Sequence, residues 1–194
     1  MGKAHGPKYN VPFRRRRENV TDYRARVNLL KSKTPRLVVR KSNRYILAQV
    51  YQFSSKGDLV IAQSHAKELK QFNWLPKNNT PTAYLVGLLL AKKLKNSKNE
   101  LKRVVLDIGR FTSTRNSNLF AVAIAFRDYG IECPMNEQQI SEDRIRGEHI
   151  SKYASTLDEK EFKKRFGEYL KNNIDVKKLP ELFEEVKRKI LSMV

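Results

Sequence analysis

Residues 36–64 read RLVVRKSNRYILAQVYQFSSKGDLVIAQS, and this stretch decides the fold. It holds three runs rich in β-branched and aromatic residues, separated by short polar turns, at 36–40, 45–53 and 59–64. The middle run alternates, with Ile46, Ala48 and Val50 on one face and Tyr45, Tyr51 and Phe53 on the other. Three strands joined by short turns predict an antiparallel meander.

The segments after the meander predict helices that cover the sheet. Thr80 and Pro81 are the expected N-cap and first residue of a helix, and Gly87 inside that helix indicates close backbone packing. Residues 103–108 resemble a buried strand, and the Ala-rich residues 119–129 predict a helix ending at Gly130. Because strand and helix alternate here, the added strand is expected to pair in parallel.

The predicted fold class is therefore α/β, of an α+β-like kind. We expect a mixed sheet made from an antiparallel three-strand meander plus a parallel strand, covered by helices in a ribonuclease-H-like topology. The expected parts are a basic arm (1–18), a globular domain (19–133) and a helical C-terminal extension (134–194). Gly and Pro residues in the arm predict an extended conformation, whereas Thr21 is the expected N-cap of a short helix after it.

The charge of the chain is large and unevenly distributed. The 194 residues include 40 Lys or Arg and 20 Asp or Glu, a formal net charge of +20. Residues 1–33 hold ten basic and two acidic residues, residues 34–133 hold seventeen and six, and residues 134–194 hold thirteen and twelve. An excess of this size favours a polyanionic partner. We therefore expect an intracellular nucleic-acid-binding protein whose C-terminal third is not the main contact.

Several classes of function lack the residues they need. The single cysteine, Cys133, excludes a disulfide framework within the chain and a Cys-rich zinc site, and His5, His65 and His149 lack metal-ligand spacing. No P-loop or dinucleotide motif occurs, so no cofactor is expected. We expect no secretory signal and no membrane partner, because the N-terminus is charged and no run of 18 apolar residues exists.

A metal-dependent nuclease is the enzymatic alternative, because ribonuclease-H-like enzymes hold divalent metals with strand-borne carboxylates. Such a site requires two or more converging acids. Asp107 lies on a predicted strand, but Asp58 is in a turn and Asp128 is at a helix end, so convergence is not evident. The favoured role of Asp107 is structural, with its carboxylate bonded to backbone amides near Gly109 or to an arginine.

Phosphate and base contacts are the chemistry that the sequence supplies in quantity. Arginine forks suit phosphate, polar turns suit backbone or base edges, and aromatics can stack on unpaired bases, although Tyr51 and Phe53 are expected in the core. The candidate RNA-binding residues fall on the arm, the following helix, the first hairpin and the loop 110–117. They are Arg14, Arg15, Arg16, Arg17, Tyr23, Arg26, Arg36, Arg40, Lys41, Ser42, Asn43, Arg44, Arg110, Thr112, Ser113, Thr114 and Arg115. A solvated basic surface is the simpler alternative.

Short blocks in order along residues 14–150 resemble one family. They include TDYR (21–24), PRLVVRKS (35–42), NTPTAYLVGLLL (79–90), VLDIG (105–109) and RIRGEHI (144–150). Together they resemble the 5S-rRNA-binding protein family of the large ribosomal subunit, numbered eighteen in the universal scheme. The basic arm and helical extension resemble its archaeal and eukaryotic branch.

This resemblance implies a structural ribosomal protein without enzymatic activity or cofactor. It implies binding of 5S rRNA and its attachment to 23S rRNA in the central protuberance, beside neighbouring large-subunit proteins, in the cytoplasm. By the same resemblance, the hairpin residues meet 5S rRNA while the arm and the helix around Tyr23 and Arg26 reach into rRNA. A general RNA chaperone and the metal nuclease remain the alternatives.

Overall fold

The computed structural model describes residues 6–96, 101–136 and 140–193. In these residues one sheet contains β1 (Arg36–Lys41), β2 (Ile46–Gln52), β3 (Leu59–His65) and β4 (Val105–Asp107), in the order β3-β2-β1-β4. The β1–β2 and β2–β3 pairs are antiparallel, whereas β4 is parallel to β1, with Arg36 opposite Val105. The predicted mixed sheet and α/β class are therefore confirmed.

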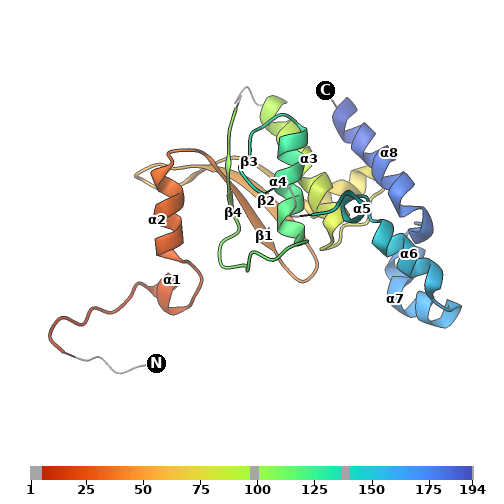
Figure 1. Ribbon diagram of the computed structural model, residues 1–194, viewed down its shortest axis with the longest axis horizontal. Coiled ribbons are helices and arrows are strands. Elements are labelled where there is room, and N and C mark those ends of the chain that lie inside the picture. The colour runs from red at the N-terminus through yellow and green to blue at the C-terminus, as the bar shows by residue number, and fades with distance from the viewer. Residues whose placement is uncertain (1–5, 97–100, 137–139, 194) are drawn as a thin grey trace.

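Helices lie at both ends of the molecule and over the sheet between them (Figure 1). The N-terminal pair lies at the end opposite the C-terminal helices, and the central pair covers the sheet. The helices are α1 (Arg14–Arg17), α2 (Tyr23–Lys31), α3 (Thr80–Asn96), α4 (Asn118–Asp128), α5 (Glu142–Arg146), α6 (Glu148–Thr156), α7 (Glu159–Lys171) and α8 (Leu179–Ser192), with 3-10 turns η1 (Ala66–Phe72) and η3 (Val176–Lys178). No described helix is long and apolar enough to cross a bilayer.

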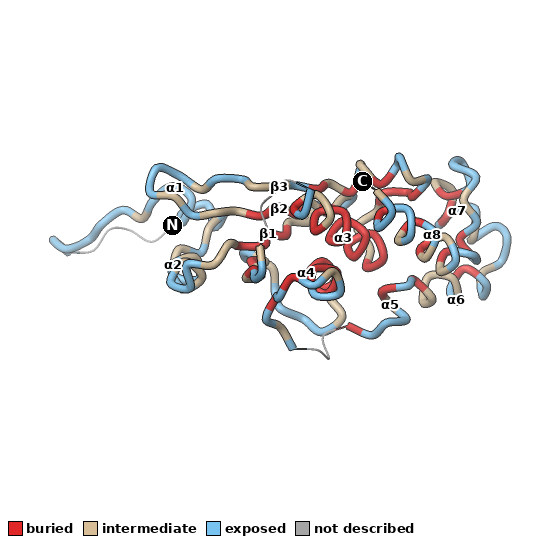
Figure 2. The backbone as a smooth tube through the Cα atoms, turned by 90° about the horizontal axis from the view of Figure 1, so that it is seen from above, coloured by how far each residue is buried: buried red, intermediate tan, exposed pale blue. Residues whose placement is uncertain are grey.

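The two faces of the sheet differ in what covers them. Ile46, Ala48 and Val50 are fully buried on the face that packs against α3 and α4. Figure 2 shows this buried region concentrated along the central strands and α3. The expectation that Tyr51 and Phe53 are core residues is wrong, because they lie on the other side, where Phe53 is 53% exposed and Tyr51 only half-buried.

The N-caps of α2 and α3 each lie one residue from the predicted position. Asp22, not Thr21, is the N-cap of α2, and its carboxylate accepts hydrogen bonds from the backbone amides of Arg24 and Ala25. Asn79, not Thr80, caps α3, since its side-chain oxygen accepts from the Thr82 amide. Both predictions missed by one position because Thr, Asp and Asn are all good caps and stood side by side.

The C-terminal extension is part of the same core as the sheet domain. Phe183 of α8 is buried and packs its ring against Trp74, with centroids 6.3 Å apart, and against Tyr84 at 5.5 Å. Val186 and Ile190 on the same face of α8 are fully buried. Removing these helices would therefore expose the core.

The close packing predicted at Gly87 is confirmed at the crossing of α3 and α4. A Cβ placed at Gly87 would lie 2.7 Å from the backbone oxygen of Val122 and 2.9 Å from the Cβ of Ala125.

We expect Gly87→Ala to lower the free energy of unfolding by about 1–3 kcal/mol, because the overlap with backbone outweighs the gain in helix propensity. Urea denaturation measures this, with Gly167→Ala, where nothing lies near the added methyl, as the control. Equal effects of both substitutions would contradict the packing argument.

Candidate nucleic-acid interface

A cationic groove runs between α2 and the open face of the sheet. Its volume is about 890 Å³, and its lining brings together residues from α1, α2, β1, β2, β4 and the loop after β4. We call it the arginine groove, because its lining includes five arginines, Arg15, Arg26, Arg36, Arg40 and Arg110. Tyr51 and Phe111 add aromatic surface to the same lining.

A chain of alternating charges fixes the floor of the arginine groove. Asp58 pairs with Arg26 of α2, at 2.9 Å from Nη2 to Oδ1, and with Arg36 of β1. Arg36 Nη1 also donates to Asp107 Oδ2 at 2.8 Å, and Arg40 Nη2 to Asp107 Oδ1 at 3.1 Å. This ion-pair chain connects α2, the turn before β3, β1 and β4, so it holds α2 against the sheet.

The predicted structural role of Asp107 is confirmed by its contacts. Besides the two arginines, its Oδ1 accepts the backbone amide of Gly109 at 2.8 Å. Gly109 has φ of +63°, and a Cβ there would lie 2.9 Å from Arg40 Cζ, so the backbone packs flat on the guanidinium. A side chain at position 109 would meet both steric and conformational cost. Asp107 therefore sets the start of the loop 110–117.

The geometry also bears on the metal-nuclease alternative. Asp58 and Asp107 do approach one another, which the sequence did not make evident, but the Arg36 guanidinium lies between them. A permanent cation thus occupies the place where a divalent metal would be needed. Within the described residues, no group of three or more His, Cys, Asp or Glu side chains could hold a metal.

Arg36 differs from the other candidate RNA contacts. Its side chain is 4% exposed, and its terminal nitrogens donate to Asp58 and Asp107. It therefore does not reach the surface, and we treat it as a group that positions its neighbours. Arg40 is intermediate: its Nη1 is bonded to the backbone oxygens of Val39 and Asp107, yet the side chain is 42% exposed at the groove.

The hairpin between β1 and β2 places its polar residues at one corner of the molecule. Lys41 Nζ lies 5.3 Å from the centre of the Phe111 ring, which joins the hairpin to the loop 110–117. Ser42 closes the turn by accepting the Tyr45 amide, whereas Asn43 is exposed. Arg44 pairs with Glu168 of α7 at 3.0 Å, a contact that sequence reasoning missed because 124 residues separate the partners.

The arm is more ordered near its arginines than the sequence suggested. Arg14, Arg15, Arg16 and Arg17 form α1, one helical turn, instead of the expected extended chain. All four side chains are exposed, and Arg15 Nε donates to Thr21 Oγ1 at 2.9 Å. The Phe13 ring lies 6.0 Å from that of Tyr23, so this short turn is seated on the start of α2. Residues 1–5 lie outside the described residues.

The loop 110–117 completes the cationic surface. All five of its predicted RNA contacts are exposed, and it leads into the N-terminus of α4. They are Arg110, Thr112, Ser113, Thr114 and Arg115. Arg110 lies in the lining of the arginine groove, whereas Arg115 lies at the far end of the loop. The structure thus joins groove, loop and hairpin into one surface.

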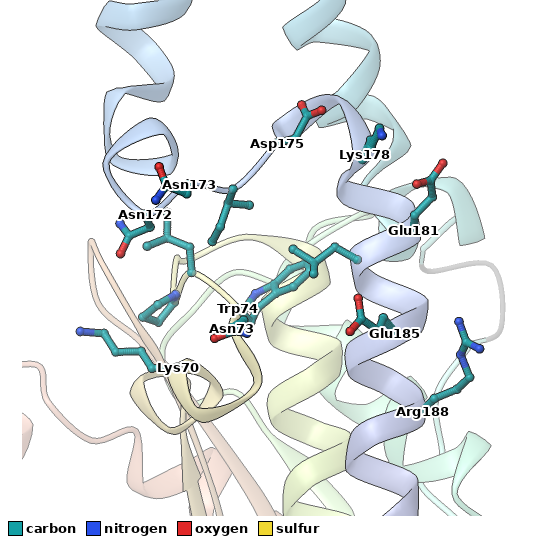
Figure 3. Close-up of a pocket in the computed structure, with 14 residues that line it drawn as sticks. Lys70, Asn73, Trp74, Asn172, Asn173, Asp175, Lys178, Glu181, Glu185 and Arg188 are labelled. Atoms are coloured by element: carbon teal, nitrogen blue, oxygen red, sulfur yellow. The ribbon is translucent and has the colours of Figure 1, made fainter.

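A second large concavity lies between the segment before α3 and the C-terminal helices. Figure 3 shows Trp74 within it, with Glu181, Glu185 and Arg188 along α8. Its lining holds three cationic and three acidic side chains. A balanced lining does not favour phosphate, so this concavity does not extend the cationic surface.

Fold and charge together define the class of the protein: a basic α/β protein with a cationic open sheet face. Residues 7–103 match the family model described as ribosomal large subunit proteins 60S L5 and 50S L18. The chain is also 44% identical, over 98% of each sequence, to the large ribosomal subunit protein uL18 of Korarchaeum cryptofilum. It therefore belongs to the uL18 family of large-subunit ribosomal proteins. Membership confirms the expected structural, non-enzymatic role in the large ribosomal subunit.

Proposed function

We propose that the protein binds 5S rRNA and helps attach it to 23S rRNA in the central protuberance. The observation that carries this proposal is the arginine groove, because the carboxylates in its lining are already bonded within the protein: Asp58 and Asp107 to arginines, and Asp22 to the first-turn amides of α2. The other cationic side chains around the groove are therefore available to contact phosphate. A paired floor and a cationic rim are suited to an RNA backbone.

The ion-pair chain prepares this surface before RNA arrives. Arg26 and Asp58 tie α2 to the turn before β3, so the walls of the groove are joined to each other without a ligand. Double-stranded RNA is recognised through its shape and its phosphates, because its major groove is too narrow for side chains. A rigid groove with aromatic and arginine walls can therefore select an RNA by shape, with unpaired bases stacking on Tyr51 or Phe111.

The C-terminal end supports contacts of another kind. Its balanced charge and its concavity of mixed polarity, with apolar surface at Trp74 and Leu182, suit a protein neighbour better than RNA. We propose that neighbouring ribosomal proteins of the central protuberance contact this end. A ribosomal role, with RNA at one end of the molecule and proteins at the other, differs from that of a general RNA chaperone, which would bind many RNAs equally.

The test compares 5S rRNA with another structured RNA of equal length at fixed salt. We expect at least tenfold tighter binding of 5S rRNA, and a loss of about tenfold for Arg110→Gln with Arg44→Gln, since each charged contact contributes about 1 kcal/mol or more. Both residues are exposed and lie on the loop and hairpin. The control, Arg165→Gln with Lys171→Gln, makes the same charge change at exposed positions of α7 that line neither the arginine groove nor the loop 110–117. Equal affinity for the two RNAs would favour the chaperone.

A further inference from the structure

A smaller cavity of about 370 Å³ lies where three distant parts of the chain meet. The start of α3, the start of α4 and the corner between α5 and α6 surround it, with Lys41 at the end of β1. Its cationic side chains are Lys41, Arg115 and Arg144, and its described lining contains no Asp or Glu. This composition contrasts with the balanced concavity around Trp74.

Two buried polar atoms on lining residues have no hydrogen-bond partner. They are Nε of Arg144 and Nδ1 of His149, both from the α5–α6 corner. Leaving a buried donor unpaired is costly, so the Nε–H of Arg144 is a hydrogen-bond donor that the protein itself does not use. Burial and the nearby Arg144 charge lower the pKa of His149, against a hydrogen bond to the backbone of Asp143 that raises it, so the site disfavours a charged imidazole.

Helix and loop geometry add to the donors of this cavity. Ser117 is the N-cap of the eleven-residue α4, but its side chain makes no capping bond to the first-turn amides. Asn78 donates to the Ser42 backbone oxygen at 2.7 Å and accepts from Asn118 at 2.5 Å, which ties the hairpin to the start of α4. A helix N-terminus and three cations around one open hollow favour an anion.

We infer that this cavity receives one backbone phosphate of the bound RNA, held by Arg144 together with Lys41 and Arg115. The inference rests on the proposed function, because Lys41 and Arg115 also belong to the hairpin and loop of the proposed RNA surface. It adds a residue from the C-terminal third, whose net charge of +1 gave no sign of an RNA contact. The α5–α6 corner then forms the boundary of the RNA-binding surface on the side of the C-terminal helices.

The chain offers a matched control for Arg144. Arg146 lies on the same short helix and undergoes the same charge change, but it is exposed and faces Glu184 of α8 at 3.7 Å. Affinity for 5S rRNA is measured from low to high salt for the wild type, Arg144→Gln and Arg146→Gln. We expect Arg144→Gln to weaken binding about tenfold and lower the salt slope by about one, whereas Arg146→Gln preserves the slope.

Further variants separate this site from the proposed function and from a folding defect. Arg144→Lys should restore most of the slope, and Arg115→Gln, on an exposed loop, should lower it by a similar amount without affecting the fold. If Arg144→Gln and Arg146→Gln behave alike while 5S rRNA is still preferred, the phosphate site is wrong and the proposed function stands. If the wild type shows no preference for 5S rRNA over another structured RNA, the proposed function itself is wrong.

A last experiment distinguishes an RNA phosphate from a free phosphate ion. Melting temperatures of the wild type and Arg144→Gln are compared in inorganic phosphate and in chloride at equal ionic strength. We expect no stabilisation that depends on Arg144, because one free phosphate lacks the neighbouring contacts of an RNA backbone. Stabilisation by phosphate, together with an unchanged RNA slope, would overturn the inference.

Discussion

Replacing Asp107 with asparagine is expected to lower the free energy of unfolding by about 3–5 kcal/mol, because it leaves the buried Arg36 charge without one of its two partners. Asp107 is 6% exposed and Arg36 3% exposed, so water cannot take the place of the carboxylate. The variant also loses the charge that binds Arg40 and the Gly109 amide. Chemical denaturation followed by circular dichroism measures the change.

Two comparisons identify the ion-pair chain as the cause. Asp143→Asn makes the same chemical change at an exposed position and should stay within about 0.5 kcal/mol of the wild type. Arg36→Met in the Asp107→Asn background removes the buried cation that has lost one of its two partners, so the double variant should be more stable than Asp107→Asn alone. If the second substitution costs further stability, Arg36 is not the group that Asp107 neutralises.

This ion-pair chain shows where sequence reasoning reached its limit. The role of Asp107 was predictable, because a carboxylate two residues before a glycine has a local amide to accept. The burial of Arg36 was not, since its partners lie 22 and 71 residues away and only the tertiary fold brings them together. An arginine at the start of a strand therefore resembled a surface residue.

The sheet illustrates the same division between local and distant information. Alternation predicted which residues of β2 share a face, and short turns predicted the antiparallel order of β1, β2 and β3, whereas the pairing of β4 with β1 was seen only in the structure. Alternation alone does not say which face the helices cover, so Phe53 was assigned to the core although it is exposed. Arg144 was not among the predicted RNA contacts for a related reason, because its segment carries almost no net charge.

Substituting glutamine for Arg14, Arg15, Arg16 and Arg17 together is expected to weaken rRNA binding about 100-fold near physiological salt and to reduce the salt slope by about three. The side chains are exposed on α1, where they can face several phosphates at once. Because α1 buries no residue, the change should leave the melting temperature nearly unaltered. Mobility-shift titrations across a salt series measure both quantities.

The control for the arm is Lys160, Lys163, Lys164 and Lys171 replaced by glutamine, which removes the same charge from exposed positions of α7. Long-range attraction falls equally in both variants, whereas contacts with phosphate are lost only where RNA lies. The slope should therefore change with the arm variant and remain near the wild-type value with the α7 variant. Equal slopes for the two would mean that net charge, and not the position of the arm, governs binding. A larger loss with the α7 variant would reverse the orientation proposed here, with RNA at the C-terminal end.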